Sequence, residues 1–150
     1  MKKLPSHADL MSAAFEVGKG SGCIRNEHSK TGAVAVRDGQ IIASATNGAI
    51  TGLPSCATRG YCIRTKMNIP SGTMREVTYC LCAEQRIICN CARDGVALNG
   101  AEMYVTMLPC AVCIRLIISA GFKRCYYHFD YASALTREIA KEAGFELIQI

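Results

Sequence analysis

Three cysteines and one glutamate in this chain have the types and spacing of a zinc site with an acid beside it. Cys82 lies two residues before Glu84, and Cys110 and Cys113 form a Cys-x-x-Cys pair further along; both groups open apolar stretches. Residues three apart on a helix lie on one face, so Cys110 and Cys113 can reach one ion together. The sequence therefore predicts zinc bound by Cys82, Cys110 and Cys113, with Cys82 supplied by a neighbouring helix start.

Three protein ligands leave the fourth position of a tetrahedral zinc ion open. An open position is typical of catalytic zinc, whose bound water ionises near neutral pH, whereas a structural site usually closes with a fourth protein ligand. Glu84 can face that water without coordinating the metal, and we expect it to carry protons. Helix N-termini carry partial positive charge, which stabilises thiolates at both helix starts.

The elements that must position these residues follow from apolar periodicity and turn signals. Helices are predicted over residues 6–19, 82–93, 111–120 and 132–143, with Ser6 capping the first. Strands are predicted over residues 33–36, 40–46, 102–107, 124–129 and 145–150. Asp38-Gly39 between the first two strands is a strong hairpin signal. This order predicts an α/β fold, a three-layer α/β/α domain with a mixed five-stranded sheet, and leaves residues 48–77 as an irregular loop.

Length and composition fit an ordinary globular protein. The 150 residues suit a single domain over residues 1–150, and no apolar run approaches the roughly 20 residues that span a membrane. The first residues lack the apolar core of a signal peptide, so we expect a cytoplasmic protein whose ten cysteines are reduced. The formal charge of +5 is spread along the chain, and no Lys/Arg-rich tail or aromatic-basic cluster indicates nucleic-acid binding.

A ligand-x-Glu sequence followed by Pro-Cys-x-x-Cys is the signature of zinc nucleobase deaminases. Cys82-Ala-Glu84 and Pro109-Cys-Ala-Val-Cys113 accordingly resemble the cytidine and deoxycytidylate deaminase superfamily. Further stretches are similar to its deoxycytidylate (dCMP) branch, namely residues 31–42, 47–48, 52–54, 100–106 and 117–124. The resemblance covers most of the chain, from near Ser21 to Ile150.

The resemblance implies zinc-dependent hydrolysis of dCMP to dUMP and ammonia, in which zinc hydroxide attacks C4 of cytosine and Glu84 shuttles the protons. It also implies that the backbone N–H of Ala83 holds the base carbonyl and that Asn47 contacts the sugar 3′-hydroxyl. From the residues alone, Asn47 and Gly48 could equally form a simple turn, because Asn tolerates left-handed backbone. Regulation by dCTP and dTTP through residues 47–52 and assembly into a homo-oligomer, commonly a hexamer, are further implications.

Basic residues could bind the 5′-phosphate of such a nucleotide, because guanidinium groups pair with phosphate oxygens in a bidentate manner. Arg25 is the first candidate, followed by Lys30 and Arg115, and an Arg25 that makes only surface contacts is the alternative. Three thiolates also bring excess negative charge to the site. Arg86 and Arg115 are the nearest cations in sequence that could offset it.

The chain departs from the dCMP branch at two places. That branch usually has His where this chain has Cys82; Cys is more familiar in nucleoside-level cytidine deaminases, which typically follow Cys-Ala-Glu with Arg where this chain has Gln85. Ala45-Thr46 stands where the branch commonly has Gly-Tyr. Another cytosine nucleoside, a modified nucleotide or a nucleoside antibiotic therefore stays open as the substrate of the same chemistry.

The other cysteines support two further interpretations. Some members of the dCMP branch hold a second, non-catalytic zinc in the long loop, and Cys23, Cys56 and Cys80 match its ligand positions, with Cys62 as a fourth. Thiols without a metal are the alternative. From another functional class, the chain could be a structural zinc-binding module, but a structural site has no need of a free carboxylate such as Glu84.

Overall fold

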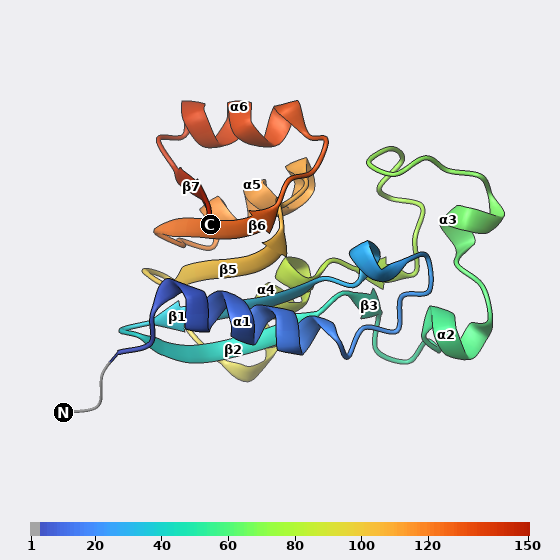
Figure 1. Ribbon diagram of the computed structural model, residues 1–150, viewed down its shortest axis with the longest axis horizontal. Coiled ribbons are helices and arrows are strands. Elements are labelled where there is room, and N and C mark those ends of the chain that lie inside the picture. Colours follow the sequence, from blue (N-terminus) through green and yellow to red (C-terminus); the bar gives the residue numbers. More distant parts are fainter. Residues whose placement is uncertain (1–3) are drawn as a thin grey trace.

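A mixed five-stranded sheet forms the middle layer of the computed structural model, which describes residues 4–150 (Figure 1). Its strands are β1 (Gly32–Arg37), β2 (Gln40–Thr46), β5 (Glu102–Met107), β6 (Arg124–Phe129) and β7 (Glu146–Gln149). They lie in the order β2-β1-β5-β6-β7. β1 is antiparallel to β2 and β5, whereas β5, β6 and β7 are parallel to one another.

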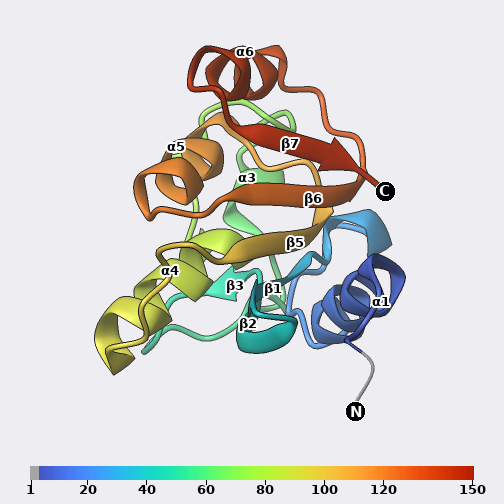
Figure 2. The ribbon, with the colours of Figure 1, turned by 90° about the vertical axis from the view of Figure 1, so that its left-hand side faces the viewer.

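Helices cover both faces of this sheet (Figure 2). They are α1 (His7–Gly18), α4 (Ala83–Asp94), α5 (Ala111–Ser119) and α6 (Ala134–Glu142). Strand side chains alternate between the two faces: Tyr104 and Tyr126 pack with α1, while Met103 and Cys125 pack in the cluster that contains α4 and α5. α6 packs against α5 and β7. The predicted three-layer α/β/α architecture is confirmed.

Local rules explain how these elements start and join. The Ser6 hydroxyl accepts from the Asp9 N–H at 3.2 Å, and the Ser6 N–H donates to the Asp9 carboxylate at 2.8 Å, so Ser6 caps α1 as predicted. Asp38 and Gly39 join β1 to β2 with φ of 51° and 74°, the positive values that a tight hairpin requires. A Cβ on Gly32 would lie 2.0 Å from a carbonyl oxygen of α1, so β1 can begin there only with glycine.

Residues 48–81 leave the sheet and return to it beside the start of α4, and they form the green segment set to one side in Figure 1. β3 (Gly48–Ala49) and β4 (Cys80–Leu81) pair antiparallel and close the base of this segment. Between them lie the single helical turns α2 (Cys56–Arg59) and α3 (Ile63–Lys66), in a stretch that the sequence indicated as irregular. No helix within residues 4–150 is long and apolar enough to cross a membrane.

Candidate functional site

The three cysteines of the predicted metal site meet where α4 and α5 begin. Cys82 is the residue before α4, Cys110 is the residue before α5, and Cys113 lies in the first turn of α5. The two helices pack against each other, α4 directly after β4 and α5 shortly after β5. Their starts therefore bring the three sulfurs within 4.8 Å of one another.

This donor set fits zinc. Tetrahedral zinc with Zn–S bonds of about 2.3 Å holds its sulfurs about 3.8 Å apart, which the spacing of the cluster accommodates. All ten cysteines are free thiols, so none of the three sulfurs is held in a disulfide. Within the described part of the chain, no fourth Cys, His, Asp or Glu joins the cluster. A tetrahedral ion bound here would keep one position for a non-protein ligand.

Glu84 lies beside the cluster in the first turn of α4 and is almost completely buried. Burial raises the pKa of its carboxyl group to about 7, and the nearby Cys110 sulfur adds to the rise. Glu84 lines the same cavity as Cys82 and Cys110. A carboxyl group that titrates near neutral pH can both accept and release a proton during a reaction.

The three thiols lie close enough to shift one another's pKa. Hydrogen bonds from Cys113 and Cys82 lower the pKa of Cys110 to about 2. The contact with Cys110 raises the pKa of Cys82 to about 12, and it raises the pKa of Cys113 as well. One thiolate is therefore favoured and two are not, and a divalent cation would be needed to hold all three in the charged form.

Among the cations of residues 4–150, Arg75 is the one that donates a hydrogen bond to this cluster, and the sequence analysis did not identify it. Its Nη2 donates to Cys82 Sγ at 2.9 Å. Burial lowers the pKa of Arg75, but the Cys82 and Cys110 sulfurs more than offset this effect and raise the pKa above its ordinary value. Arg75 therefore places a fixed positive charge against a sulfur of the predicted metal site.

Arg86 and Arg115, which the sequence predicts to offset the thiolate charge, donate hydrogen bonds to backbone carbonyl oxygens and not to the three sulfurs. The Arg86 guanidinium donates to the Thr46 carbonyl oxygen at 3.2 Å. Arg115 is exposed and donates to the Ala111 carbonyl oxygen at 3.0 Å. Two residues beyond Cys113 a helix has turned by about 200°, which explains why Arg115 points to solvent. Arg115 also lies outside the cavity lining, so the cavity gives no support to its predicted role as a phosphate ligand.

A cavity of about 300 Å³ opens in front of Glu84 and the Cys82 and Cys110 sulfurs. This volume is at the lower end of the range for small-molecule sites. Tyr131, after β6, lines the cavity, and its hydroxyl is buried without a hydrogen-bond partner. A Cβ on Gly72 would lie 3.1 Å from that hydroxyl, so Tyr131 and the 48–81 segment meet over the site.

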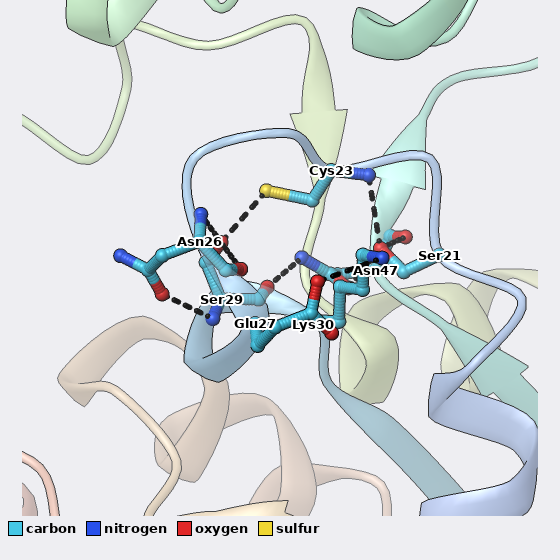
Figure 3. A network of polar contacts seen from close by, with 7 residues as sticks. All are labelled: Ser21, Cys23, Asn26, Glu27, Ser29, Lys30 and Asn47. Atoms are coloured by element: carbon cyan, nitrogen blue, oxygen red, sulfur yellow. Dashed lines mark hydrogen bonds and ion pairs between the residues drawn. The ribbon is translucent and has the colours of Figure 1, made fainter.

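Asn47 also lines the cavity, and its side chain binds the loop that precedes β1 (Figure 3). The amide oxygen accepts from the Ser21 hydroxyl at 2.8 Å and from the Thr31 N–H at 2.9 Å. The amide nitrogen donates to the Ser29 carbonyl at 2.8 Å, which leaves one amide hydrogen for another acceptor. Neither Asn47 nor Gly48 has the positive φ of a left-handed turn, and Gly48 begins β3. The alternative that these two residues form a simple turn is therefore wrong.

The other residues predicted to bind substrate differ in whether they lie at the cavity. Arg25 lines the cavity, whereas Lys30 does not and pairs with Glu27 at 3.4 Å, next to the 3₁₀ turn η1 (Glu27–Ser29). Ala83 is fully buried as the first residue of α4, so its N–H belongs to the helix N-terminus beside Glu84. Arg25 is thus the predicted phosphate ligand that remains at the cavity.

All four cysteines predicted for a second zinc line the cavity: Cys23, Cys56, Cys62 and Cys80. The Cys56 and Cys80 sulfurs are 3.9 Å apart, and burial together with Cys80 raises the pKa of Cys56 to about 12. The Cys23 sulfur contacts the Ser29 hydroxyl at 3.1 Å. Within residues 4–150 these four thiols do not form a cluster as tight as that of the first site.

Comparison with known families gives a match over most of the chain. The model of the family described as cytidine and deoxycytidylate deaminase zinc-binding region matches residues 4–129. ComE operon protein 2 of Bacillus subtilis is 36% identical over 126 residues, which are 79% of this chain and 59% of that protein. The chain thus spans less than two thirds of that relative. The deoxycytidylate deaminase of Mycobacterium phage D29 is 34% identical over 103 residues, 67% of this chain and 79% of the relative.

Solved structures agree with the fold. The dCMP deaminase of cyanophage S-TIM5, solved in complex with dCMP and dUMP, has a TM-score of 0.73 and 25% identity, with 93% of each chain covered. A diaminohydroxyphosphoribosylaminopyrimidine deaminase/reductase from Thermotoga maritima has a TM-score of 0.63 and 26% identity, with 93% of this chain but 35% of that chain covered. The fold is therefore that of the deaminases, in agreement with the sequence prediction.

Proposed function

Because the chain belongs to the cytidine and deoxycytidylate deaminase family, in its deoxycytidylate branch, we propose that it hydrolyses dCMP to dUMP and ammonia with a zinc ion. One observation carries this proposal. The described chain holds three clustered sulfurs without a fourth protein donor, set beside the buried carboxyl group of Glu84. A structural zinc module would close the site with a protein ligand and would leave Glu84 without a role.

Cys82, Cys110 and Cys113 would hold the ion, which when bound supplies the positive charge that makes a water molecule acidic. Glu84 takes a proton from the attacking water and passes it to N3 of the cytosine ring. A second transfer through the same carboxyl group protonates the C4 amino group. That group leaves as ammonia, while the attacking oxygen becomes the C4 carbonyl of dUMP. The N–H of Ala83, at the start of α4, holds the base carbonyl in place.

The phosphate requirement rests on Arg25, which lines the cavity, and the sugar contact rests on the remaining amide hydrogen of Asn47. Ammonia release from dCMP, deoxycytidine and related cytosine compounds, measured with and without dCTP, tests the assignment. We expect kcat/KM to be highest for dCMP. Equal values for dCMP and deoxycytidine would remove the phosphate claim, and a higher value for a modified nucleotide or a nucleoside antibiotic would reassign the substrate.

A second zinc, a homo-oligomer such as a hexamer, and dCTP/dTTP control through residues 47–52 are separate parts of the proposal. The 3.9 Å separation of the Cys56 and Cys80 sulfurs supports the second ion, although Cys23 and Cys62 would have to move closer. We expect two zinc ions per chain, falling to one in Cys56→Ser. A wild-type protein with only one zinc ion per chain would show that the second site does not exist. Light scattering with and without dCTP would test whether the chain assembles into a homo-oligomer.

A further inference from the structure

A buried arginine in the 48–81 segment organises the stretch of backbone that carries Arg75. Arg64, in α3, is 4% exposed, and its guanidinium donates four hydrogen bonds to backbone carbonyl oxygens. These acceptors lie on both sides of Arg75 in the sequence and belong to Pro70, Thr73, Met74 and Val77. One side chain therefore fixes the backbone before and after Arg75.

The residue before Arg75 shows why the backbone needs the four hydrogen bonds from Arg64, which we call the Arg64 clamp. Met74 has φ of 43°, a left-handed conformation that is unfavourable for a residue with a Cβ. Arg64 Nη1 donates to the Met74 carbonyl oxygen at 2.6 Å, which stabilises this turn of the chain. The turn directs the next side chain, Arg75, to Cys82 Sγ at 2.9 Å.

The negative charge of the predicted metal site explains why a cation such as Arg75 would lie against Cys82. Three thiolates and a divalent cation leave one negative charge, and uncompensated charge in a partly buried site is costly. Among the arginines of residues 4–150, Arg75 is the one that donates to a sulfur of the cluster. Arg86 and Arg64 donate to backbone carbonyls, and Arg115 faces solvent.

We propose that Arg75 neutralises the three-thiolate zinc site, and that Arg64 is a positioning residue that acts through Arg75. The inference deepens the proposed function and relies on it for the identity of the metal. Residues that hydrogen-bond to metal ligands typically change metal affinity 10- to 100-fold when they are replaced. The 48–81 segment would then tune the metal site without supplying a ligand to it.

Zinc affinity, measured without substrate by competition with a chromophoric chelator, tests both roles in the full chain. Arg75→Gln should weaken zinc binding about 10- to 100-fold. Arg75→Lys should recover part of the loss, because a compact charge can still reach the sulfur. Arg59→Gln is the matched control: Arg59 lies in the same segment, with its guanidinium 4.4 Å from the centre of the Tyr79 ring, and its replacement should leave zinc affinity unchanged.

The double-mutant cycle tests whether Arg64 acts through Arg75. Arg64→Met should weaken zinc binding in the same direction as Arg75→Gln, and the double variant should bind zinc no more weakly than Arg75→Gln alone. Additive losses would overturn the positioning role. If circular dichroism shows that Arg64→Met does not fold, Arg64→Lys takes its place in the cycle.

Two outcomes separate this inference from the proposed function. Unchanged zinc affinity in Arg75→Gln overturns the neutralising role even if the wild type deaminates dCMP. If that variant instead raises KM for dCMP but not for deoxycytidine, Arg75 is a phosphate ligand, which also overturns the proposal. If Arg75→Gln binds zinc more weakly but the wild type releases no ammonia from any cytosine compound, the neutralising role of Arg75 is upheld and the proposed function is rejected.

Discussion

Two regions of the molecule meet at the metal site, and they hold their functional residues by different means. α4 and α5 present the cysteines and Glu84 from apolar packing, in which Ile87 and Ile117 are fully buried. The 48–81 segment presents Arg75 through hydrogen bonds from one buried cation to backbone carbonyls, and it exposes large apolar residues such as Leu53 and Met67.

The core and the 48–81 segment therefore have different roles at the site. The core determines where three sulfurs and a carboxyl group lie, and damage to it should affect the whole fold. The segment determines the charge beside those sulfurs and the covering of the cavity, and damage to it should be local. Changes in each region should therefore be distinguishable by whether global stability or only binding is altered.

The largest effect should come from the core side, at Glu84 itself. Glu84→Gln removes the proton carrier but keeps the size of the side chain, so kcat for ammonia release should fall about 10²- to 10⁴-fold. Zinc content, measured by atomic absorption, should be unchanged, because Glu84 is not among the clustered donors. Undiminished turnover in this variant would show that Glu84 is not the proton carrier.

A cavity in the core should lower the stability of the whole protein. Ile117→Ala on α5 should reduce the free energy of unfolding by about 2–5 kcal/mol, measured by urea denaturation. Leu53→Ala, at an exposed site of the 48–81 segment, is the matched control and should change it by about 0.5 kcal/mol or less. A similar loss in both variants would mean that the segment is part of the global folding unit.

The cavity wall should control substrate affinity without altering either stability or zinc binding. Arg25→Gln should raise KM for dCMP about 10- to 100-fold, because a charge-assisted hydrogen bond to the phosphate contributes about 1.5–3 kcal/mol. KM for deoxycytidine should stay the same. Parallel rises for both substrates would place Arg25 against the sugar or base, or outside binding altogether.

The smallest effect should come from relieving the strained turn before Arg75. Met74 is exposed and left-handed, so Met74→Gly should keep the clamp and stabilise the turn by up to about 1 kcal/mol. Zinc affinity should be unchanged, because the carbonyl that Arg64 binds remains. A marked loss of zinc affinity would show that the Met74 side chain, rather than its carbonyl, positions Arg75.

Much of the core could be predicted from the sequence because its signals are local. Apolar periodicity placed every helix and strand of the three layers within two residues of its observed bounds. The spacing of Cys82, Cys110 and Cys113 predicted their convergence, because residues three apart share a helix face and two helix starts can adjoin. The same local reasoning explains why the Asp38-Gly39 hairpin was correct.

The contacts of the 48–81 segment could not be predicted in this way. Arg75 is seven residues from Cys82, but it reaches the sulfur through irregular backbone that has no periodicity. Nothing in the sequence marks the four carbonyls that Arg64 binds. Arg115 is a different case, because the helical phase after Cys113 already indicates that its side chain points away from the three sulfurs.

Catalysis by zinc at three sulfurs acting together with Glu84 is tested most directly by one titration. Zinc is added to the metal-free protein while conversion of dCMP to dUMP is followed. Turnover should rise with zinc and reach a plateau when the site of Cys82, Cys110 and Cys113 is filled, and Glu84→Gln should bind the same zinc without turnover. Full turnover before zinc is added, or none after the site is filled, would contradict the account.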